Sequence, residues 1–118
     1  MPIRIEENIP EGSSQVAEVP VYDEEGDPAV PTAAWYSLYD ASGNVINERE
    51  DVVITDLAAT LYVLLTPADT AMSTAQAKEA RILALKWTAP STLMPGEDLT
   101  GREEARFSVE RMMGVGST

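Results

Sequence analysis

The apolar runs of this chain repeat with a period of two. The two clearest runs are Ala59 to Leu65 and Arg81 to Thr88, and their inward positions are Leu61, Val63, Leu65, Leu83, Leu85 and Trp87. A period of two is typical of β-strands, because successive side chains point to opposite faces, whereas an amphipathic helix repeats its apolar residues every three to four positions. The alternation therefore predicts an all-β fold.

Further segments have strand character and are separated by turn residues. They are Gln15 to Tyr22, Trp35 to Tyr39, Val45 to Ile46, Val52 to Ile54 and Glu103 to Met112. About seven short strands with turn signals between them predict an immunoglobulin-like antiparallel β-sandwich. We expect residues 1–14 to form an extended N-terminal arm, residues 15–113 to form the sandwich, and residues 114–118 to fray.

Local features predict how these elements are placed. Pro20 has no backbone N–H, so its strand should lie at a sheet edge or turn the proline nitrogen to solvent. Ala59 to Leu65 is apolar on both faces, which predicts a central place in a sheet. Residues 40–44 are expected to form a hairpin turn, residues 73–80 a short helical connection, and residues 89–101 a long loop.

Composition excludes several classes of function. The chain has 118 residues, enough for one domain with one core. It contains no cysteine and no histidine, which excludes disulfides, thiolate metal sites and the usual general base. Asp and Glu outnumber Lys and Arg by 20 to 8, for a net charge of −12, and such a surface repels nucleic acid and anionic membranes. No apolar run is long enough to span a bilayer and residues 1–10 do not resemble a signal peptide, so we expect a soluble protein made in the cytoplasm.

The carboxylates of the chain do not predict a catalytic site. They gather in segments typical of solvated turns, at residues 23–27, 48–51, 97–98 and 103–104. A glycosidase needs two carboxyl groups across a cleft, one of them with a raised pKa. The acidic segment Asp23 to Pro31 lacks the ligand spacing of an EF-hand loop, and no phosphate-binding or dinucleotide-binding motif occurs. We therefore predict no catalytic residue, no cofactor, no metal site and no enzyme activity.

Two aromatic residues are candidates for a protein contact. In the strand from Trp35 to Tyr39, Tyr36 and Leu38 are assigned to the core, which places Trp35 and Tyr39 on the outer face. The two rings would be about 13 Å apart at the usual strand rise. Either a neighbouring loop or the N-terminal arm covers them, or they form a contact with another protein, since aromatic residues are enriched in interface cores.

The two ends of the chain supply the other contact candidates. Ile3, Ile5 and Ile9 lie in the N-terminal arm, which is either disordered or contains a short strand that pairs with a neighbouring subunit. Met112 and Met113 lie at the C-terminal end of the sandwich.

Two stretches of the chain resemble a known family. Residues 19–28 read V-x-V-[YF]-D-E-x-G-x-P and residues 38–47 read L-x-D-x-x-G-N-V-I-N, followed by an acidic bend at residues 49–51. The matching residues are Val19, Val21, Tyr22, Asp23, Glu24, Gly26, Pro28, Leu38, Asp40, Gly43, Asn44, Val45, Ile46, Asn47, Arg49, Glu50 and Asp51. This pattern resembles small immunoglobulin-like proteins encoded among the virion structural genes of tailed bacteriophages. A looser likeness extends over residues 60–69, 81–87 and 104–115.

The resemblance implies an architectural role. We expect a non-enzymatic structural subunit of the virion, made in the bacterial host cytoplasm and placed at the head-to-tail junction (neck, connector or tail) or on the capsid surface. It would contact other virion proteins, in several copies in a symmetric assembly, and the charge of −12 favours a partner with a basic surface. The alternative is a carbohydrate-binding or adhesion module in which Trp35 and Tyr39 form a platform for sugars.

Overall fold

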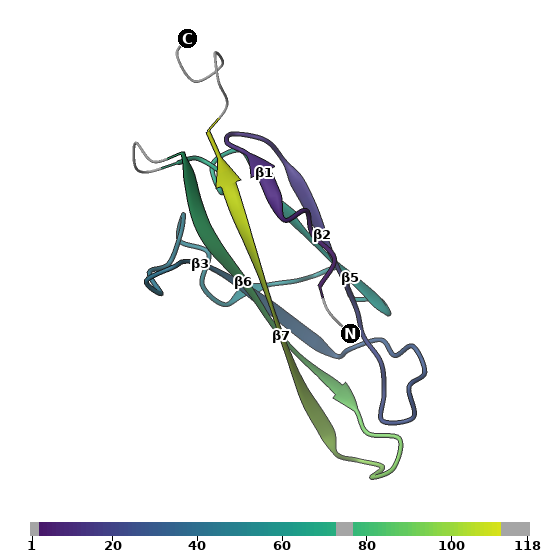
Figure 1. Cartoon of the computed structure of the whole chain (residues 1–118). Coiled ribbons are helices and arrows are strands. Elements are labelled where there is room, and N and C mark those ends of the chain that lie inside the picture. The colour runs from purple at the N-terminus through teal and green to yellow at the C-terminus, as the bar shows by residue number, and fades with distance from the viewer. Residues whose placement is uncertain (1–2, 73–76, 112–118) are drawn as a thin grey trace.

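The computed structural model describes residues 3–72 and 77–111. It is all-β, and the described residues contain no helix, which confirms the prediction from the period of two. The strands are β1 (Asn8–Pro10), β2 (Gln15–Pro20), β3 (Ala33–Asp40), β4 (Val52–Val53), β5 (Thr60–Leu65), β6 (Lys78–Pro90) and β7 (Asp98–Glu110) (Figure 1).

The strands form two sheets. In spatial order, β1, β7, β6, β3 and β4 form a five-stranded sheet, and β2 and β5 form a two-stranded sheet. All neighbours are antiparallel except β1 and β7, which are parallel. β6 and β7 are each 13 residues long, and their hairpin extends beyond the other strands at one end of the molecule (Figure 1).

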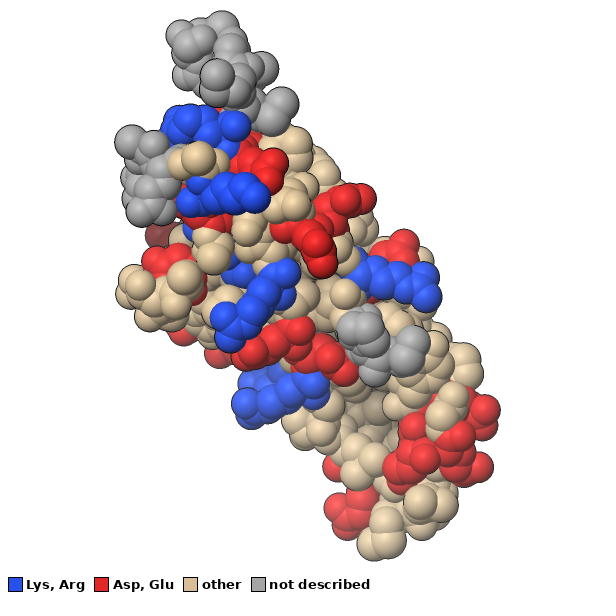
Figure 2. All heavy atoms as spheres, viewed as in Figure 1, with Lys and Arg blue, Asp and Glu red and all other residues tan. Residues whose placement is uncertain are grey.

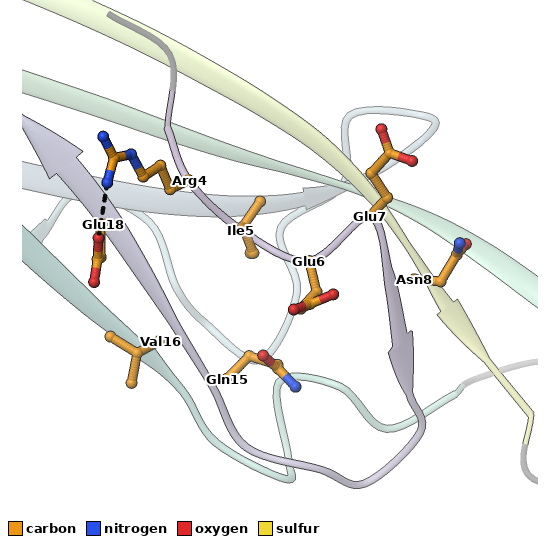
Figure 3. Close-up of a pocket in the computed structure, with 8 residues that line it drawn as sticks. All are labelled: Arg4, Ile5, Glu6, Glu7, Asn8, Gln15, Val16 and Glu18. Atoms are coloured by element: carbon orange, nitrogen blue, oxygen red, sulfur yellow. Dashed lines mark ion pairs between the residues drawn. The ribbon is translucent and has the colours of Figure 1, made fainter.

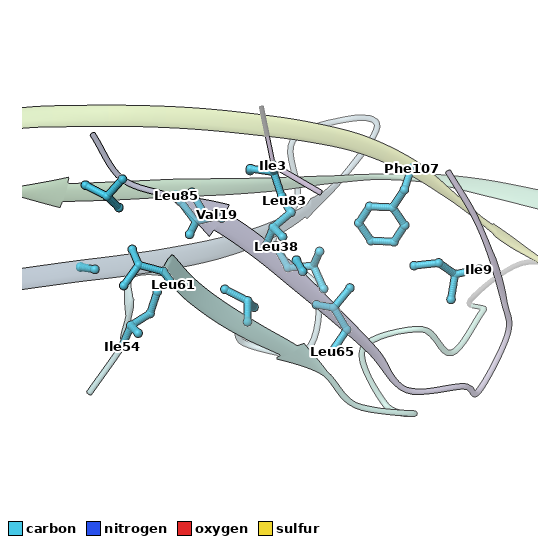
Figure 4. Packing of buried hydrophobic residues seen from close by; sticks show 14 of the residues in the cluster. Ile3, Ile9, Val19, Leu38, Ile54, Leu61, Leu65, Leu83, Leu85 and Phe107 are labelled. Atoms are coloured by element: carbon cyan, nitrogen blue, oxygen red, sulfur yellow. The ribbon is translucent and has the colours of Figure 1, made fainter. Parts of the chain in front are cut away.

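One hydrophobic core contains side chains from both sheets (Figure 4). The two-stranded sheet contributes Ala17, Val19, Leu61, Val63 and Leu65. The five-stranded sheet contributes Ile9, Ala34, Leu38, Leu83, Leu85, Phe107 and Val109. Full burial of one of the larger side chains contributes about 1.5–3 kcal/mol. The predicted inward positions of β5 and β6 are therefore in the core, except that Trp87 only packs against its margin.

The N-terminal segment belongs to the folded domain. Ile3 is 8 % exposed and Ile9 is fully buried. Arg4 forms an antiparallel bridge with Glu18 of β2, and β1 pairs with the end of β7, so the segment joins the edge of one sheet to the edge of the other. This corrects the expectation of an extended arm for residues 3–14, because Ile3 and Ile9 fill the core of their own chain.

The structure also corrects the predicted place of the segment Ala59 to Leu65. In the described part of the chain, β5 pairs only with β2, so it lies at a sheet edge. Its inner side chains are buried, whereas Tyr62 and Leu64 on the outer face are each 56 % exposed. Among the residues that the structure describes, this strand is apolar on both faces but is covered on one face alone.

The connections around β6 differ from the prediction as well. Lys78 to Ala80 begin β6, so the helical prediction is wrong for those residues, and residues 73–76 of that prediction lie outside the described residues. Residues 89–90 and 98–101 belong to β6 and β7, so the expected long loop is shortened to residues 91–97. The turn after β3 forms as predicted, with the Gly43 N–H donating to the Asp40 carbonyl at 3.1 Å.

Candidate protein-contact site

The β6–β7 hairpin and a neighbouring loop form a distinct end of the molecule. Residues 87–101 provide the last part of the hairpin, and residues 21–31 provide the loop after β2; together we call them the hairpin end. β6 and β7 remain paired as far as Pro90 and Asp98. The turn between them is closed by the Ser91 N–H, which donates to the Glu97 carbonyl at 2.8 Å.

Glu24 joins the loop to the hairpin. Its carboxylate accepts hydrogen bonds from the Ser91 hydroxyl at 2.5 Å, the Thr92 N–H at 3.1 Å and the Leu93 N–H at 3.3 Å. The hydrogen bond from Ser91 and then that from Thr92 lower the pKa of Glu24 from 4.5 to about 2. Glu24 is therefore charged at neutral pH, and it fixes the start of the turn.

The turn that Glu24 fixes presents apolar side chains to solvent. Leu93 is 67 % exposed and Met94 is 62 % exposed, and Tyr22, Val30 and Leu99 of the same end are exposed too. Large apolar side chains that gather at one exposed place mark interaction surfaces more often than isolated ones do. Because the turn is already ordered, a partner that binds these side chains has less conformational entropy to overcome.

The charges of the hairpin end have one sign. Its residues include six acidic side chains, Asp23, Glu24, Glu25, Asp27, Glu97 and Asp98, and no Lys or Arg. Figure 2 shows basic side chains over the upper and middle parts of the molecule, whereas the lower end, where the hairpin turns, carries acidic and uncharged residues. The apolar turn is therefore surrounded by negative charge.

Trp87 forms one wall of a groove in the hairpin end. The groove has a volume of about 230 Å³ and is lined by Tyr22, Glu24, Trp87, Leu99 and Gly101, among others. A Cβ atom on Gly101 would collide with the ring of Trp87, which lies directly over this glycine. Glycine is therefore required at position 101 for the ring to keep its place.

Trp35 and Tyr39 lie on one face of β3, as predicted, and both are half-buried. The buried Ser37 lies between them, and its hydroxyl accepts a hydrogen bond from the Asp51 N–H at 2.8 Å. The Lys86 ammonium lies 5.1 Å from the centre of the Trp35 ring, in cation–π geometry. This ammonium occupies a ring face that a sugar would need, so the arrangement does not favour a stacking platform at Trp35.

The other predicted contact residues have different positions. Ile3 and Ile9 are buried in the core, which removes them from any contact surface, and Ile5 is partly buried against that core. These isoleucines alternate with polar residues because they pack against the core of their own domain. Met112 and Met113 lie outside the described residues.

A groove with a volume of about 600 Å³ runs between the N-terminal segment and β2. Figure 3 shows Glu6, Glu7 and Glu18 directed to different sides of this groove, and only Glu18 forms an ion pair there, with Arg4 at 3.9 Å. No two of these carboxylates face each other across the groove as an acid and a base would. We therefore read this groove as the space left where the segment crosses between the sheets.

The buried carboxylate of Asp69 is held by hydrogen bonds and has a structural role. Asp69 accepts hydrogen bonds from the Asn47 amide at 2.8 Å, the Arg49 Nε at 3.0 Å, and the Thr66 N–H and hydroxyl at 2.8 and 2.9 Å. Burial alone would raise its pKa, but these hydrogen bonds outweigh burial and hold the pKa below 3.8. Both carboxylate oxygens are thus occupied, and Asp69 fixes the chain that follows β5.

Sequence reasoning missed the exposed pair Leu93 and Met94 because the segment was predicted as a plain loop. The signal that was available is the absence of Lys and Arg from residues 87–101, together with two large apolar residues next to Pro95 and Gly96. The bond between Glu24 and Ser91 spans 67 positions of the sequence, and no local pattern indicates it.

The described residues contain no group of three or more acidic side chains placed to hold a metal ion, and no helix long and apolar enough to cross a membrane. Comparison with models of protein families, with curated proteins and with solved structures finds no match to this chain.

Proposed function

We propose that this protein is a non-enzymatic structural subunit that works by protein–protein contacts, and that it belongs to the virion of a tailed phage. Within the particle it would lie at the head-to-tail junction or on the capsid surface, bound to other virion proteins. The resemblance of residues 19–28 and 38–51 to small virion proteins supports the setting. The hairpin end is the observation that carries the contact function.

The strand order supports an immunoglobulin-like β-sandwich. Such domains place the second and fifth strands of the fold in one sheet and the third, sixth and seventh in the other. The pairs β2–β5 and β3–β6–β7 follow this order, and β1 lies beside β7. Domains of this architecture serve widely as adhesion and assembly modules, which is an argument from analogy.

The chemistry of the hairpin end defines its partner. Leu93 and Met94 require an apolar pocket, and the six carboxylates around them require Lys or Arg at the rim of that pocket. A second copy of the chain does not satisfy this requirement at its own hairpin end, since that end has no basic residue. The net charge of −12 also repels a second copy, so we take the partner to be a different protein with a basic rim, and salt should weaken the contact.

The test is mass spectrometry of phage particles purified from the source that encodes the chain, followed by assembly with variants. We expect the protein to be present in the particles. Replacing Leu93→Asp together with Met94→Asp should reduce incorporation by about tenfold or more, because two central apolar contacts are lost. The matched control is Val53→Asp, since Val53 on β4 is exposed by the same 62 % as Met94.

Two results would overturn the proposal. If the protein is absent from purified particles, it is not a virion subunit. If the double variant is incorporated as well as the Val53 control, the hairpin end is not the contact surface. Binding to a glycan array that is lost with Trp35→Ala would instead establish the sugar-binding alternative.

A further inference from the structure

The outer edge of β5 carries backbone groups that its own sheet does not use. The Val21 N–H donates to the Ala59 carbonyl at 2.8 Å, which fixes the phase of the β2–β5 ladder. Since hydrogen-bonded pairs alternate in antiparallel sheets, the odd residues of β5 bond to β2. Thr60, Tyr62 and Leu64 therefore direct their N–H and C=O groups away from β2, toward the open edge.

The two hydrogen bonds between Glu18 and Arg4 show the same alternation on β2. Glu18 donates its N–H to the Arg4 carbonyl and accepts the Arg4 N–H, at 2.9 and 2.8 Å, so its backbone is directed away from β5. Glu18 is opposite Tyr62 in the ladder, and the two do not bond to each other. The N–H and C=O groups of Tyr62 are therefore directed away from β2, toward the open edge of β5. In the described residues no other strand pairs with β5 on that side.

The side chains along this edge do not protect it. Tyr62 and Leu64 are each 56 % exposed, and Val16, the neighbour of Leu64 on β2, is 52 % exposed. Residues 57–68 contain no charged side chain. Natural edge strands are usually protected by charges, prolines or bulges, and β5 has none of them.

We propose that the open edge of β5 pairs with the same edge of a second copy of this chain. The two strands would run antiparallel about a two-fold axis at Tyr62, so that Tyr62 lies opposite Tyr62 and Thr60 lies opposite Leu64. All three residues direct their backbone groups to this edge, so the pairing forms about six hydrogen bonds. The two-stranded sheets of the two copies become one continuous sheet with a shared apolar outer face.

Charge and symmetry favour a second copy as the occupant. A chain with a net charge of −12 repels its copy, but least where two uncharged segments meet, and residues 57–68 form such a segment. An edge strand is self-complementary under a two-fold axis, because each N–H meets the C=O of the same strand in the other copy. This contact is separate from the hairpin end, and salt should strengthen it by screening the repulsion.

Single cysteines test the pairing, because the chain contains no cysteine. Cα atoms of a hydrogen-bonded antiparallel pair are about 5.5 Å apart, within the range that a disulfide spans. We expect Tyr62→Cys to form a disulfide-linked dimer under mild oxidation about tenfold or more faster than Glu104→Cys, an exposed position on the open edge of β7. A mixture of Thr60→Cys and Leu64→Cys proteins should give mostly the mixed dimer.

Sedimentation velocity of the unmodified chain accompanies this test, so that the result does not depend on the variants. We expect a monomer–dimer equilibrium that shifts toward dimer as salt increases. A monomer at every salt concentration up to about 1 mM protein would overturn the proposal. Equal oxidation of the Tyr62 and Glu104 variants would also overturn it, and would leave another protein's strand as the occupant of this edge.

Discussion

The open edges of β5 and β7 both carry unpaired backbone N–H and C=O groups, but the side chains along β5 are apolar and those along β7 are charged. β1 covers only Ser108–Glu110 of β7, so within the described residues the preceding part of β7 pairs with β6 on one side and with no strand on the other. The Ser108 N–H donates to the Glu7 carbonyl, so the even residues of β7 face the open side. These residues include Arg102, Glu104 and Arg106, whose side chains are exposed, whereas β5 presents Tyr62 and Leu64.

The side chains determine which of the two edges is available for pairing. Long charged side chains on an edge strand make pairing costly, because a new neighbour must remove them from water. β7 carries such side chains at three successive open positions, and β5 carries none. On the proposed pairing, two edges with equivalent hydrogen-bonding groups differ in their availability to a second strand because of their side chains.

Substitutions on the two faces of β5 should differ most strongly in their effect on stability. Leu65 is fully buried and Leu64 is 56 % exposed, although they are neighbours in the sequence. Leu65→Ala should lower the free energy of unfolding by about 2–5 kcal/mol, because it leaves a cavity in the core. Leu64→Ala should change the unfolding of the monomer by less than about 0.5 kcal/mol and weaken only self-association. Urea denaturation at low protein concentration measures both, and equal losses would contradict the assigned faces.

The next effect concerns the network that fixes the end of β5. Asp69→Ala should lower the free energy of unfolding by about 2–4 kcal/mol, because the Arg49 and Asn47 donors lose their acceptor. The pKa of Asp69 is lowered in the folded state, so its contribution is present above its ordinary pKa of 3.8 and is lost as pH falls through the lower folded value. Chemical denaturation of both proteins between pH 7 and pH 2 measures this. A difference between them that grows on acidification would contradict the assignment.

A smaller effect converts the edge of β7 into one like that of β5. Glu104→Tyr with Arg106→Leu should create a second pairing edge and produce species larger than a dimer in sedimentation velocity. The control is Ala84→Leu, which adds apolar surface to the same outer face at the central strand β6. If the control associates as strongly as the edge variant, apolar area alone determines association and the comparison of edges fails.

The smallest effect lies in the hairpin end. Glu24→Ala removes the acceptor of the Ser91 hydroxyl and of the Thr92 and Leu93 N–H groups, so these two amides should exchange faster while core amides do not change. In the unmodified protein the hydrogen bonds from Ser91 and Thr92 lower the pKa of Glu24 to about 2, so the NMR signal of the Glu24 side-chain carboxyl carbon should remain nearly unchanged down to about pH 3 and shift as pH falls through about 2. A shift centred near the ordinary pKa of 4.5 would show that Glu24 does not hold the turn.

Local alternation was sufficient to predict the strands β2, β3, β5 and β6 and their inward faces. The predicted strand Val45 to Ile46 does not form, since Val45 makes only an isolated bridge with Tyr39. Leu61, Val63, Leu83 and Leu85 are buried as the period of two predicts, because burial of one face determines the register of a strand. The turn at residues 40–44 also follows from its Asp, Gly and Asn residues.

Long-range pairing was not predictable from local patterns. Ile9 was read as part of an arm, because its parallel partner on β7 lies 100 positions later in the sequence. β5 was read as a central strand because its sequence is apolar on both faces, and the structure places it at an edge. On the proposed pairing, a second copy would supply the neighbour that this composition indicates.

Hydrogen exchange of the open-edge amides, measured at rising protein concentration, shows whether β5 gains a neighbouring strand. We predict that the Tyr62 and Leu64 amides exchange more slowly as concentration rises, while the Arg102 and Glu104 amides exchange at a constant rate, because only β5 gains a neighbour. Exchange at Tyr62 and Leu64 that is independent of concentration, or slowing that occurs on β7 instead, would contradict the account.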